Sequence, residues 1–279
     1  MSLLSVYVVI YISSIPLARC SVHLPYTERT LRMEASEYEI LAHVEHHHWW
    51  YTGMRTIADA WLRQLPTTAQ PRRILDAGCG TGGNLTWLTH YGSPLGFDFA
   101  SHALSHAPSA FPLLRASITN MPFADASFDL VTSFEVIYHR GVHDDVLALK
   151  ECARVLAPTG HLLLRLPAFN WLRGHHDDRV HGARRYTTAD LHHKLAQAGL
   201  TPLRTSYVNT LLLPLALWQR FRERQHTDIA PESDLQIPSP FVNTVAHGAL
   251  QLESSWLRMG GRFPVGVSLL CLARPHRST

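Results

Sequence analysis

The chain has 279 residues, of which 46% are hydrophobic and 17% charged, and a formal net charge of +3. These values exclude a disordered chain and suit one large α/β domain or a domain with a substantial insertion. The basic side chains form no long run or stripe, so no nucleic-acid partner is expected. The four cysteines are far apart without paired spacing, which favours the reducing cytoplasm over a disulfide framework.

The first part of the chain is apolar and uncharged over residues 2–17. It has no basic n-region and is short for a membrane-spanning helix. A translation start at Met33 is therefore favoured over a membrane anchor, and residues 1–32 are expected to be an extension outside the folded core. A helical cap is predicted over residues 33–70, with a break near Gly53.

Strands and helices then alternate through a predicted core, residues 71–208. Strands are predicted at 73–77, 94–98, 112–117, 128–134, 160–166 and 203–208, with helices starting at 82 and 100 and spanning 143–156 and 188–198. This alternation predicts a doubly wound, Rossmann-like α/β sheet. Right-handed crossovers place the carboxyl ends of its parallel strands on one side, where ligands bind.

Residues 209–262 do not follow this alternation and predict a helical insertion. Within it, residues 211–221 are very apolar but too short to span a bilayer. They indicate a lid helix over the site or, as a second interpretation, an interfacial patch for a lipid-like substrate. A further helix is predicted at 241–259. The last strand, within 263–275, is expected to insert antiparallel at the sheet edge and to complete a seven-stranded, mostly parallel sheet.

The most informative motif is a glycine-rich turn after the first strand, Ile-Leu-Asp-Ala-Gly-Cys-Gly-Thr-Gly-Gly-Asn at 74–84. Glycines let the backbone turn sharply and approach a ligand. Asp98, at the end of the next strand, is placed to accept hydrogen bonds from a ribose diol. The first, second and fourth glycines also match the dinucleotide pattern G-x-G-x-x-G. Asp76 favours a ligand ammonium group instead, because it would repel a pyrophosphate.

With these residues the sequence resembles the class I S-adenosylmethionine-dependent methyltransferases of the methyltransferase-domain 11 type. The matching residues are Leu75-Asp76-Ala77-Gly78-Cys79-Gly80-Thr81-Gly82, Gly96-Phe97-Asp98, Met121-Pro122-Phe123 with Asp125, Ser127-Phe128-Asp129, Glu135-Val136 and Glu151-Cys152-Ala153-Arg154-Val155-Leu156. A looser likeness to bacterial enzymes rests on His48-Trp49-Trp50-Tyr51 with Arg55, Arg184-Arg185-Tyr186-Thr187 and Pro264-Val265-Gly266-Val267-Ser268. The resemblance implies S-adenosyl-L-methionine as cofactor and transfer of its methyl group.

The resemblance also implies which residues contact the cofactor. Gly78 and Gly80 line its methionine part, Asp76 lies close to its amino group, and Asp98 takes the ribose hydroxyls. The set is completed by Phe99, by Ser117 and Ile118 beside the adenine, and by Phe134 and Glu135 near the transferable methyl. Ser117 stands where the family often has an acid, and Phe134 fits a plain core position equally well.

His139 follows the fourth predicted strand of the core, where a general base or a substrate-orienting group belongs. The ordinary pKa of imidazole suits removal of a proton near neutral pH. The alternative is an exposed histidine that caps the next helix. Trp50 and Tyr51 are predicted to close over the sulfonium or an apolar substrate, with core packing as the alternative.

His181, Arg185 and Tyr186 are predicted to contact the substrate. Arg185 and its neighbours suit an anionic group held by a bidentate fork, with helix packing and surface charge as the alternative. The histidines and aspartates at 175–181 match no metal motif, so no metal is expected.

The sequence therefore predicts a cytoplasmic methyltransferase that acts on an O, N or C atom of a small molecule, either a secondary metabolite or a lipid-like compound. Membrane association is not favoured, and the sequence specifies neither the acceptor nor the oligomeric state. Two other classes remain open: an NAD-dependent oxidoreductase, and a non-catalytic, membrane-associated protein that binds a cofactor.

Overall fold

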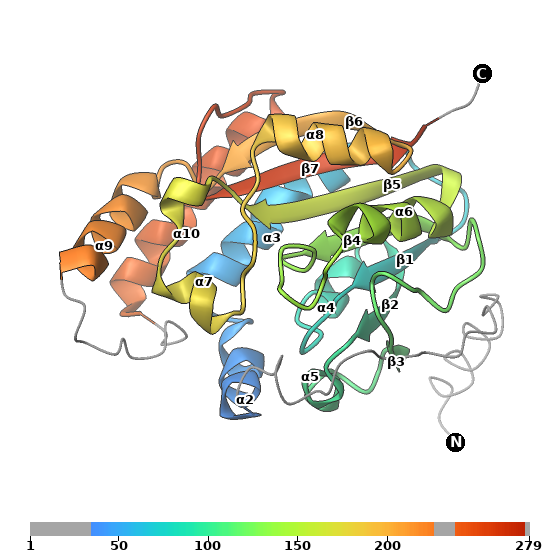
Figure 1. Ribbon diagram of the computed structural model, residues 1–279, viewed down its shortest axis with the longest axis horizontal. Coiled ribbons are helices and arrows are strands. Elements are labelled where there is room, and N and C mark those ends of the chain that lie inside the picture. The colour runs from blue at the N-terminus through green and yellow to red at the C-terminus, as the bar shows by residue number, and fades with distance from the viewer. Residues whose placement is uncertain (1–34, 226–237, 277–279) are drawn as a thin grey trace.

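Seven strands form one mixed sheet in the order β3-β2-β1-β4-β5-β7-β6 (Figure 1). The computed structural model describes residues 35–225 and 238–276. The strands are β1 (Arg72–Ala77), β2 (Gly92–Asp98), β3 (Leu113–Arg115), β4 (Phe128–Phe134), β5 (Leu156–Pro167), β6 (Leu200–Val208) and β7 (Ser268–Pro275). Strands β1 to β5 pair in parallel, and β7 pairs antiparallel with β5 and β6. The predicted doubly wound, mostly parallel sheet with an antiparallel last strand is confirmed.

The last strand, β7, was expected at the sheet edge. It lies instead between β5 and β6. Its first six residues are all buried, and both of its backbone edges pair with a neighbouring strand. β6 is the edge strand instead, and its exposed Leu203 and half-buried Arg204 tolerate that position. A strand with this many apolar residues is better buried in the sheet interior than left at an edge.

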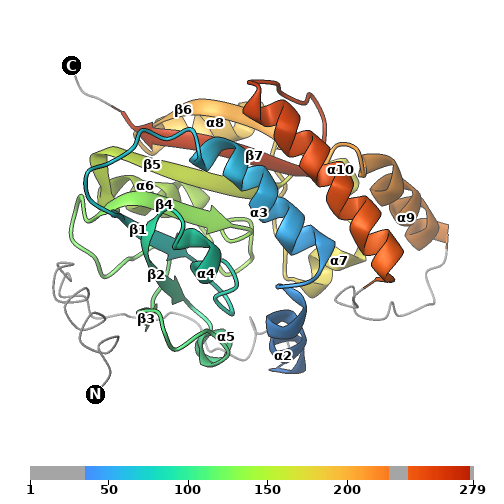
Figure 2. The same ribbon diagram turned by 180° about the vertical axis from the view of Figure 1, so that it is seen from behind.

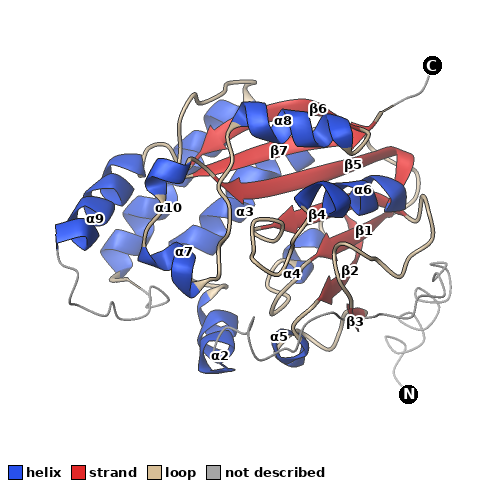
Figure 3. Ribbon diagram, viewed as in Figure 1, coloured by secondary structure: helices blue, strands red, loops and turns tan. Residues whose placement is uncertain are grey.

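Helices cover both faces of the sheet, as Figures 1 and 2 show from opposite sides and Figure 3 by element type. One face carries α6 (Asp145–Val155) and α8 (Thr188–Gln197), and the other carries α3 (Trp49–Leu62), α4 (Leu85–Leu88) and α10 (Pro240–Arg258). The remaining helices are α2 (Ala35–Val44), α5 (Ser101–Ser105), α7 (His175–Arg179), α9 (Leu213–Gln225) and the short 3-10 helix η2 (Asn170–Leu172). A separate apolar cluster lies on each face of the sheet.

The N-terminal helical segment breaks at residues 45–48, between α2 and α3, and not near Gly53 as predicted. His48 caps α3, because its side chain accepts a hydrogen bond from the N–H of Trp50. Gly53 lies within α3 and faces α10, where an added Cβ would lie 2.3 Å from Leu250 Cδ1. This glycine therefore serves the close approach of two helices and does not end one.

The segment predicted as an insertion carries α9 and α10. α10 packs along α3 and buries Leu250 and Leu257 on the sheet. No helix in the described ranges, 35–225 and 238–276, is both long and apolar enough to cross a membrane. The predicted N-terminal extension, residues 1–32, lies outside the described residues.

Candidate active site

The glycine-rich turn after β1 is tied to the end of β2. The N–H groups of Gly78 and Cys79 donate to the carbonyl oxygen of Phe97, at 2.9 and 2.8 Å. Gly78, Gly80 and Gly82 have φ angles of 82°, 54° and 78°, a region that residues with a Cβ rarely adopt. A Cβ at Gly80 would meet nothing within 4 Å. The turn therefore leaves bare backbone beside the carboxyl end of β2, with room for a ligand.

Asp76, in β1, is 1% exposed and has one unsatisfied carboxylate oxygen. Its Oδ1 accepts a hydrogen bond from the hydroxyl of Thr132 at 2.7 Å, whereas Oδ2 has no partner among the described residues. Burial raises the pKa of Asp76 to about 6, and the nearby carboxylate of Asp98 also raises it. A buried carboxylate oxygen without a partner costs free energy. The site therefore fits a ligand that brings a hydrogen-bond donor or a positive charge, such as the amino group of a methionine moiety.

Asp98 ends β2 and faces the glycine turn. Its Oδ2 accepts a hydrogen bond from the N–H of Gly80, and its Oδ1 accepts one from the N–H of Ala100, both at 2.8 Å. These bonds fix the orientation of the carboxylate, and burial raises its pKa. A carboxylate has about four acceptor positions, so Asp98 can still accept a hydrogen bond from a ligand hydroxyl beside its backbone bonds. This geometry fits the two hydroxyls of a ribose.

Phe99, Ser117 and Ile118 follow the ends of β2 and β3, so the structure brings them to the same region. The guanidinium of Arg115 lies 5.6 Å from the ring centroid of Phe99, and its Nε donates to the Phe99 carbonyl at 3.0 Å. The hydroxyl of Ser117 hydrogen-bonds the hydroxyl of Thr119 at 2.9 Å, so it supports its own turn. Ile118 is buried in the core, at 5% exposure.

Phe134 and Glu135 lie where β4 ends, beside a buried arginine that the sequence analysis missed. Arg165, in β5, donates from Nε to Oε1 of Glu135 at 3.2 Å, and its guanidinium lies 4.9 Å from the ring centroid of Phe134. Glu135 has a φ of 58°, which is uncommon for a residue with a side chain. The sequence does contain a sign of this residue, because Arg165 is the one charged residue in the apolar run Leu-Leu-Leu-Arg-Leu at 162–166.

A second missed group links the N-terminal helices to the glycine turn. Glu45, between α2 and α3, is buried and accepts a hydrogen bond from the hydroxyl of Thr81 at 3.0 Å. An added Cβ at Gly83 would lie 2.2 Å from this carboxylate, so the two groups are in close contact. Arg55 in α3 donates to the carbonyls of Glu45 and Gly83, at 2.6 and 3.2 Å. Burial raises the pKa of Glu45 to about 7.

Tyr51 lies close to Glu135 and Arg165 at the end of β4. Trp50 packs on the core instead. Burial raises the pKa of the Tyr51 hydroxyl, and the nearby carboxylates of Glu45 and Glu135 raise it further, against the effect of Arg165. Trp50 is half-buried and packs against the apolar cluster that contains α3 and α10. The structure therefore brings Tyr51, Glu135 and Arg165 to one place.

His139 and His181 lie against each other, with ring centroids 5.8 Å apart. Burial, with the nearby charges of His181 and Arg140, lowers the pKa of His139 to about 4. Its Nδ1 accepts a hydrogen bond from the N–H of Gly141 at 3.1 Å, so in the neutral ring Nε2 carries the proton. The geometry makes Nε2 a hydrogen-bond donor and leaves no free nitrogen to accept a proton.

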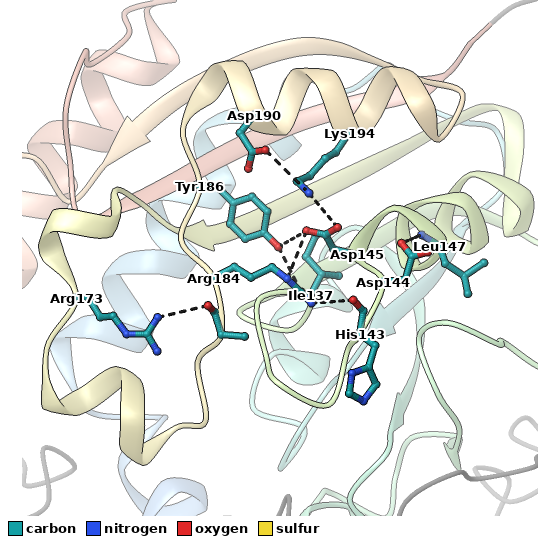
Figure 4. Close-up of polar contacts among 11 residues, drawn as sticks. Ile137, His143, Asp144, Asp145, Leu147, Arg173, Arg184, Tyr186, Asp190 and Lys194 are labelled. Carbon is teal, nitrogen blue, oxygen red and sulfur yellow. Dashed lines mark hydrogen bonds and ion pairs between the residues drawn. The ribbon is translucent and has the colours of Figure 1, made fainter.

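Tyr186 is a buried structural residue, which corrects its prediction as a substrate contact. It is 0% exposed, and its hydroxyl donates to Oδ2 of Asp145 at 2.9 Å (Figure 4). Lys194 Nζ lies 3.1 Å from the other oxygen of Asp145, and Arg184 donates to the carbonyls of Ile137 and His143. This network joins α8, α6 and the loop after β4, because buried polar groups require partners.

Arg185 is also used internally, which corrects its prediction as an anion-binding group. Its Nε and Nη2 pair with the two carboxylate oxygens of Asp177 at 2.8 and 3.0 Å, and its Nη1 donates to the carbonyl of Ala168 at 2.8 Å. Both side chains of this pair are about 5% exposed. The bidentate geometry that the sequence analysis foresaw is present, but its partner is a carboxylate of the same chain.

The segment that carries the glycine turn is similar in sequence to known methyltransferases. Residues 75–164 match the model of a methyltransferase domain family. A probable S-adenosylmethionine-dependent methyltransferase of Mycobacterium tuberculosis is 32% identical over 132 residues, which cover 42% of this chain and 47% of that protein. A probable tRNA methyltransferase 9B of Mus musculus is 31% identical over 118 residues, which cover 41% and 26%. The chain therefore spans about half the length of the first of these relatives, and less of the second.

Among solved structures, the [4+2]-cyclase SpnF is similar in fold, with a TM-score of 0.58 and 17% identity over 95% of this chain and 99% of that one. This likeness concerns the fold alone, since one fold can carry different reactions. The sheet order, the glycine turn and the matched domain agree with the resemblance found in the sequence. Residues 75–164 therefore match the methyltransferase domain family, and the chain is similar to S-adenosylmethionine-dependent methyltransferases in this segment.

Proposed function

We propose that this protein transfers the methyl group of S-adenosylmethionine to an O, N or C atom of a small-molecule acceptor. The observation that carries the proposal is the unpaired Oδ2 of Asp76, buried beside a glycine turn that is open at Gly80. An ammonium group satisfies this oxygen, whereas the pyrophosphate of NAD would be repelled by the carboxylate. The same observation disfavours the oxidoreductase alternative.

Each part of the cofactor has a matching group in the chain. Asp76, Gly78 and Gly80 hold the methionine part, Asp98 holds the ribose, and Phe99, Ser117 and Ile118 border the adenine. Phe134 and Glu135 would border the methyl group that is transferred. When bound, the cofactor supplies a methyl group on an activated leaving group. The chain mainly has to align the acceptor with this group and exclude water.

Acceptor binding is assigned to the groups that surround the end of β4. Tyr51, Glu135 and Arg165 offer a hydroxyl, a carboxylate and a guanidinium to orient a polar part of the acceptor. His139 can add a hydrogen bond from Nε2, and His181 lies beside it. The helical cap, residues 33–70, and the helices of 209–262 complete the acceptor side in this proposal.

A small molecule in the cytoplasm is proposed over a nucleic acid because of the distribution of charge and thiols. The net charge is only +3, and the basic residues form no stripe for a phosphate backbone. Cys79, Cys152 and Cys271 are buried free thiols, as is usual in a reducing compartment.

Titration calorimetry with S-adenosylmethionine, S-adenosylhomocysteine and NAD tests the cofactor assignment. Asp98→Ala should weaken S-adenosylmethionine binding by about 10- to 100-fold, because a hydrogen bond to a charged group contributes about 1.5–3 kcal/mol. Asp178→Ala, at an exposed aspartate, should bind like the wild type. Tighter binding of NAD, or unchanged binding by Asp98→Ala, would contradict the proposal. Candidate acceptors, including tRNA, are then screened for formation of S-adenosylhomocysteine.

A further inference from the structure

Helix α10 has two apolar faces, and only one of them is covered. Ala246, Leu250 and Leu257 are buried on the inner face, toward α3 and the sheet. The outer face carries an exposed stripe made of Phe241, Val245, Leu252, Trp256 and Met259. These residues follow one another at intervals of four, seven, four and three residues, so they line one side of the helix.

The exposure of this outer stripe is large for apolar side chains. Phe241, Leu252 and Met259 are 78%, 68% and 75% exposed, and Trp256 is 48% exposed. Single exposed apolar residues are common, but a stripe along a whole helix marks a surface that contacts something else. The turn at Gly261 and Arg262 contacts the Trp256 ring, and most of the remaining stripe is open to solvent in the part of the chain that the structure describes.

Helix α9 lies at the same end of the molecule as α10 (Figures 1 and 2) and has exposed apolar side chains of its own. Leu211, just before the helix, and Leu215 and Trp218 within it are about half exposed and share one side at intervals of four and three residues. Phe221, one turn further on, is 60% exposed. We call the exposed residues of α9 and the outer stripe of α10 the α9–α10 face.

Three exposed arginines lie in or beside the two helices that carry this face. Arg222, Arg258 and Arg262 are exposed, whereas the carboxylate of Glu253 is fully buried and accepts a hydrogen bond from the N–H of Leu211. The guanidinium of Arg222 lies 4.8 Å from the ring centroid of Trp218. Arginine, tryptophan and long apolar side chains on an exposed helix are the composition of helices that lie in a membrane interface.

We propose that the α9–α10 face docks on the surface of an anionic lipid bilayer. The apolar stripe enters the boundary between head groups and acyl chains, and the arginines meet the lipid phosphates. A second copy of the chain is a poorer occupant, because two-fold pairing would bring the same arginines together. The inference does not depend on the proposed methyl transfer, and it requires no membrane-spanning helix.

Vesicle co-sedimentation of the full chain tests the inference, with phosphatidylcholine alone and with added phosphatidylglycerol. Binding should require the anionic lipid and decrease at high salt. The double substitution Leu252→Gln/Met259→Gln should reduce binding about tenfold or more, since each side chain loses the burial of a large apolar group. The control Leu147→Gln/Leu203→Gln alters two exposed leucines on other elements and should leave binding unchanged. Substitution at exposed positions preserves folding, which thermal unfolding verifies.

Three results would overturn the inference. The first is that the wild type does not bind the anionic vesicles. The second is that the double variant binds them as well as the wild type, which would assign the binding to another part of the chain. The third is a wild-type dimer in light scattering that the double variant converts to a monomer, which would assign the face to a second copy. Loss of vesicle binding with unchanged S-adenosylmethionine binding separates this test from that of the proposed function.

Discussion

The imidazole of His139 illustrates how burial changes the role of a residue that sequence alone would make a base. Its pKa is lowered to about 4, mainly by burial, so the ring is neutral throughout the physiological range. A base with so low a pKa accepts protons weakly near pH 7. Because Nδ1 is occupied by the N–H of Gly141, the ring offers a hydrogen bond from Nε2. We therefore expect His139 to orient the acceptor and not to deprotonate it.

His139→Ala should lower turnover about tenfold, the effect of losing one hydrogen bond, and leave S-adenosylmethionine binding intact. His139→Gln retains a side-chain N–H and should keep more activity than His139→Ala. Turnover of the wild type should show no step from this group near pH 6.5, since its pKa lies well below. The measurements are methyl-transfer rates across pH and cofactor titrations. Equal loss in both variants would favour proton removal, and unchanged turnover in His139→Ala would exclude any role.

The residues at the glycine turn could be assigned from sequence because the groups that form this part of the site are neighbours along the chain. Asp76 and the glycines are close in the chain, so the motif itself determines their arrangement. Arg185 and Tyr186 could not be assigned in this way. Their partners, Asp177 and Asp145, are other side chains brought to them by folding, and only the structure shows that the polar groups are already paired.

At the scale of elements, the periodic strands and helices were predictable, and the errors lie where tertiary contacts decide. The predicted helix break at Gly53 followed from the poor helix propensity of glycine. The contact between α3 and α10 overrides that propensity, because a side chain at this position would collide with Leu250. Similarly, the antiparallel direction of β7 was foreseen but not its place between β5 and β6, since strand order depends on non-local pairing.

Two helical glycines provide a matched test of this packing. Gly53→Ala places a Cβ 2.3 Å from Leu250 Cδ1 and should lower the free energy of unfolding by about 1–3 kcal/mol. Gly248→Ala, in α10, meets nothing within 4 Å and should instead raise it by about 0.5–1 kcal/mol. Denaturant unfolding measures both. Gly53→Ala should cost less stability in a Leu250→Ala background than in the wild type, because the side chain that it meets is then shorter. Equal effects of Gly53→Ala and Gly248→Ala would refute the packing argument.

At the scale of the whole molecule, the N-terminal helices and the glycine turn are joined through one buried carboxylate. Glu45 lies between α2 and α3 and contacts Thr81 and Gly83 in the turn. Burial raises its pKa to about 7, and burial raises that of Asp76 to about 6. Between pH 4.5 and 7 the folded state thus binds more protons than the unfolded state at Glu45, and stability from this residue falls as pH rises. The lowered pKa of His139 acts in the opposite direction, because its protonation below pH 6.5 favours the unfolded state.

Glu45→Gln should therefore remove a pH dependence and not simply weaken the fold. Below about pH 4 the wild-type carboxyl is largely protonated in both states, and the two proteins should have similar stability. Near pH 8 the wild type must hold a buried carboxylate, so Glu45→Gln should be more stable by up to about 3 kcal/mol, the equivalent of raising the pKa from 4.5 to about 7. Denaturant unfolding across this range measures the difference, and Glu39→Gln, at an exposed position of α2, serves as the control. A variant destabilised equally at all pH values would contradict this expectation, because an effect of the carboxylate charge must change with pH as the group ionises. The glutamine keeps the hydrogen-bond acceptor for Thr81 and loses only the charge.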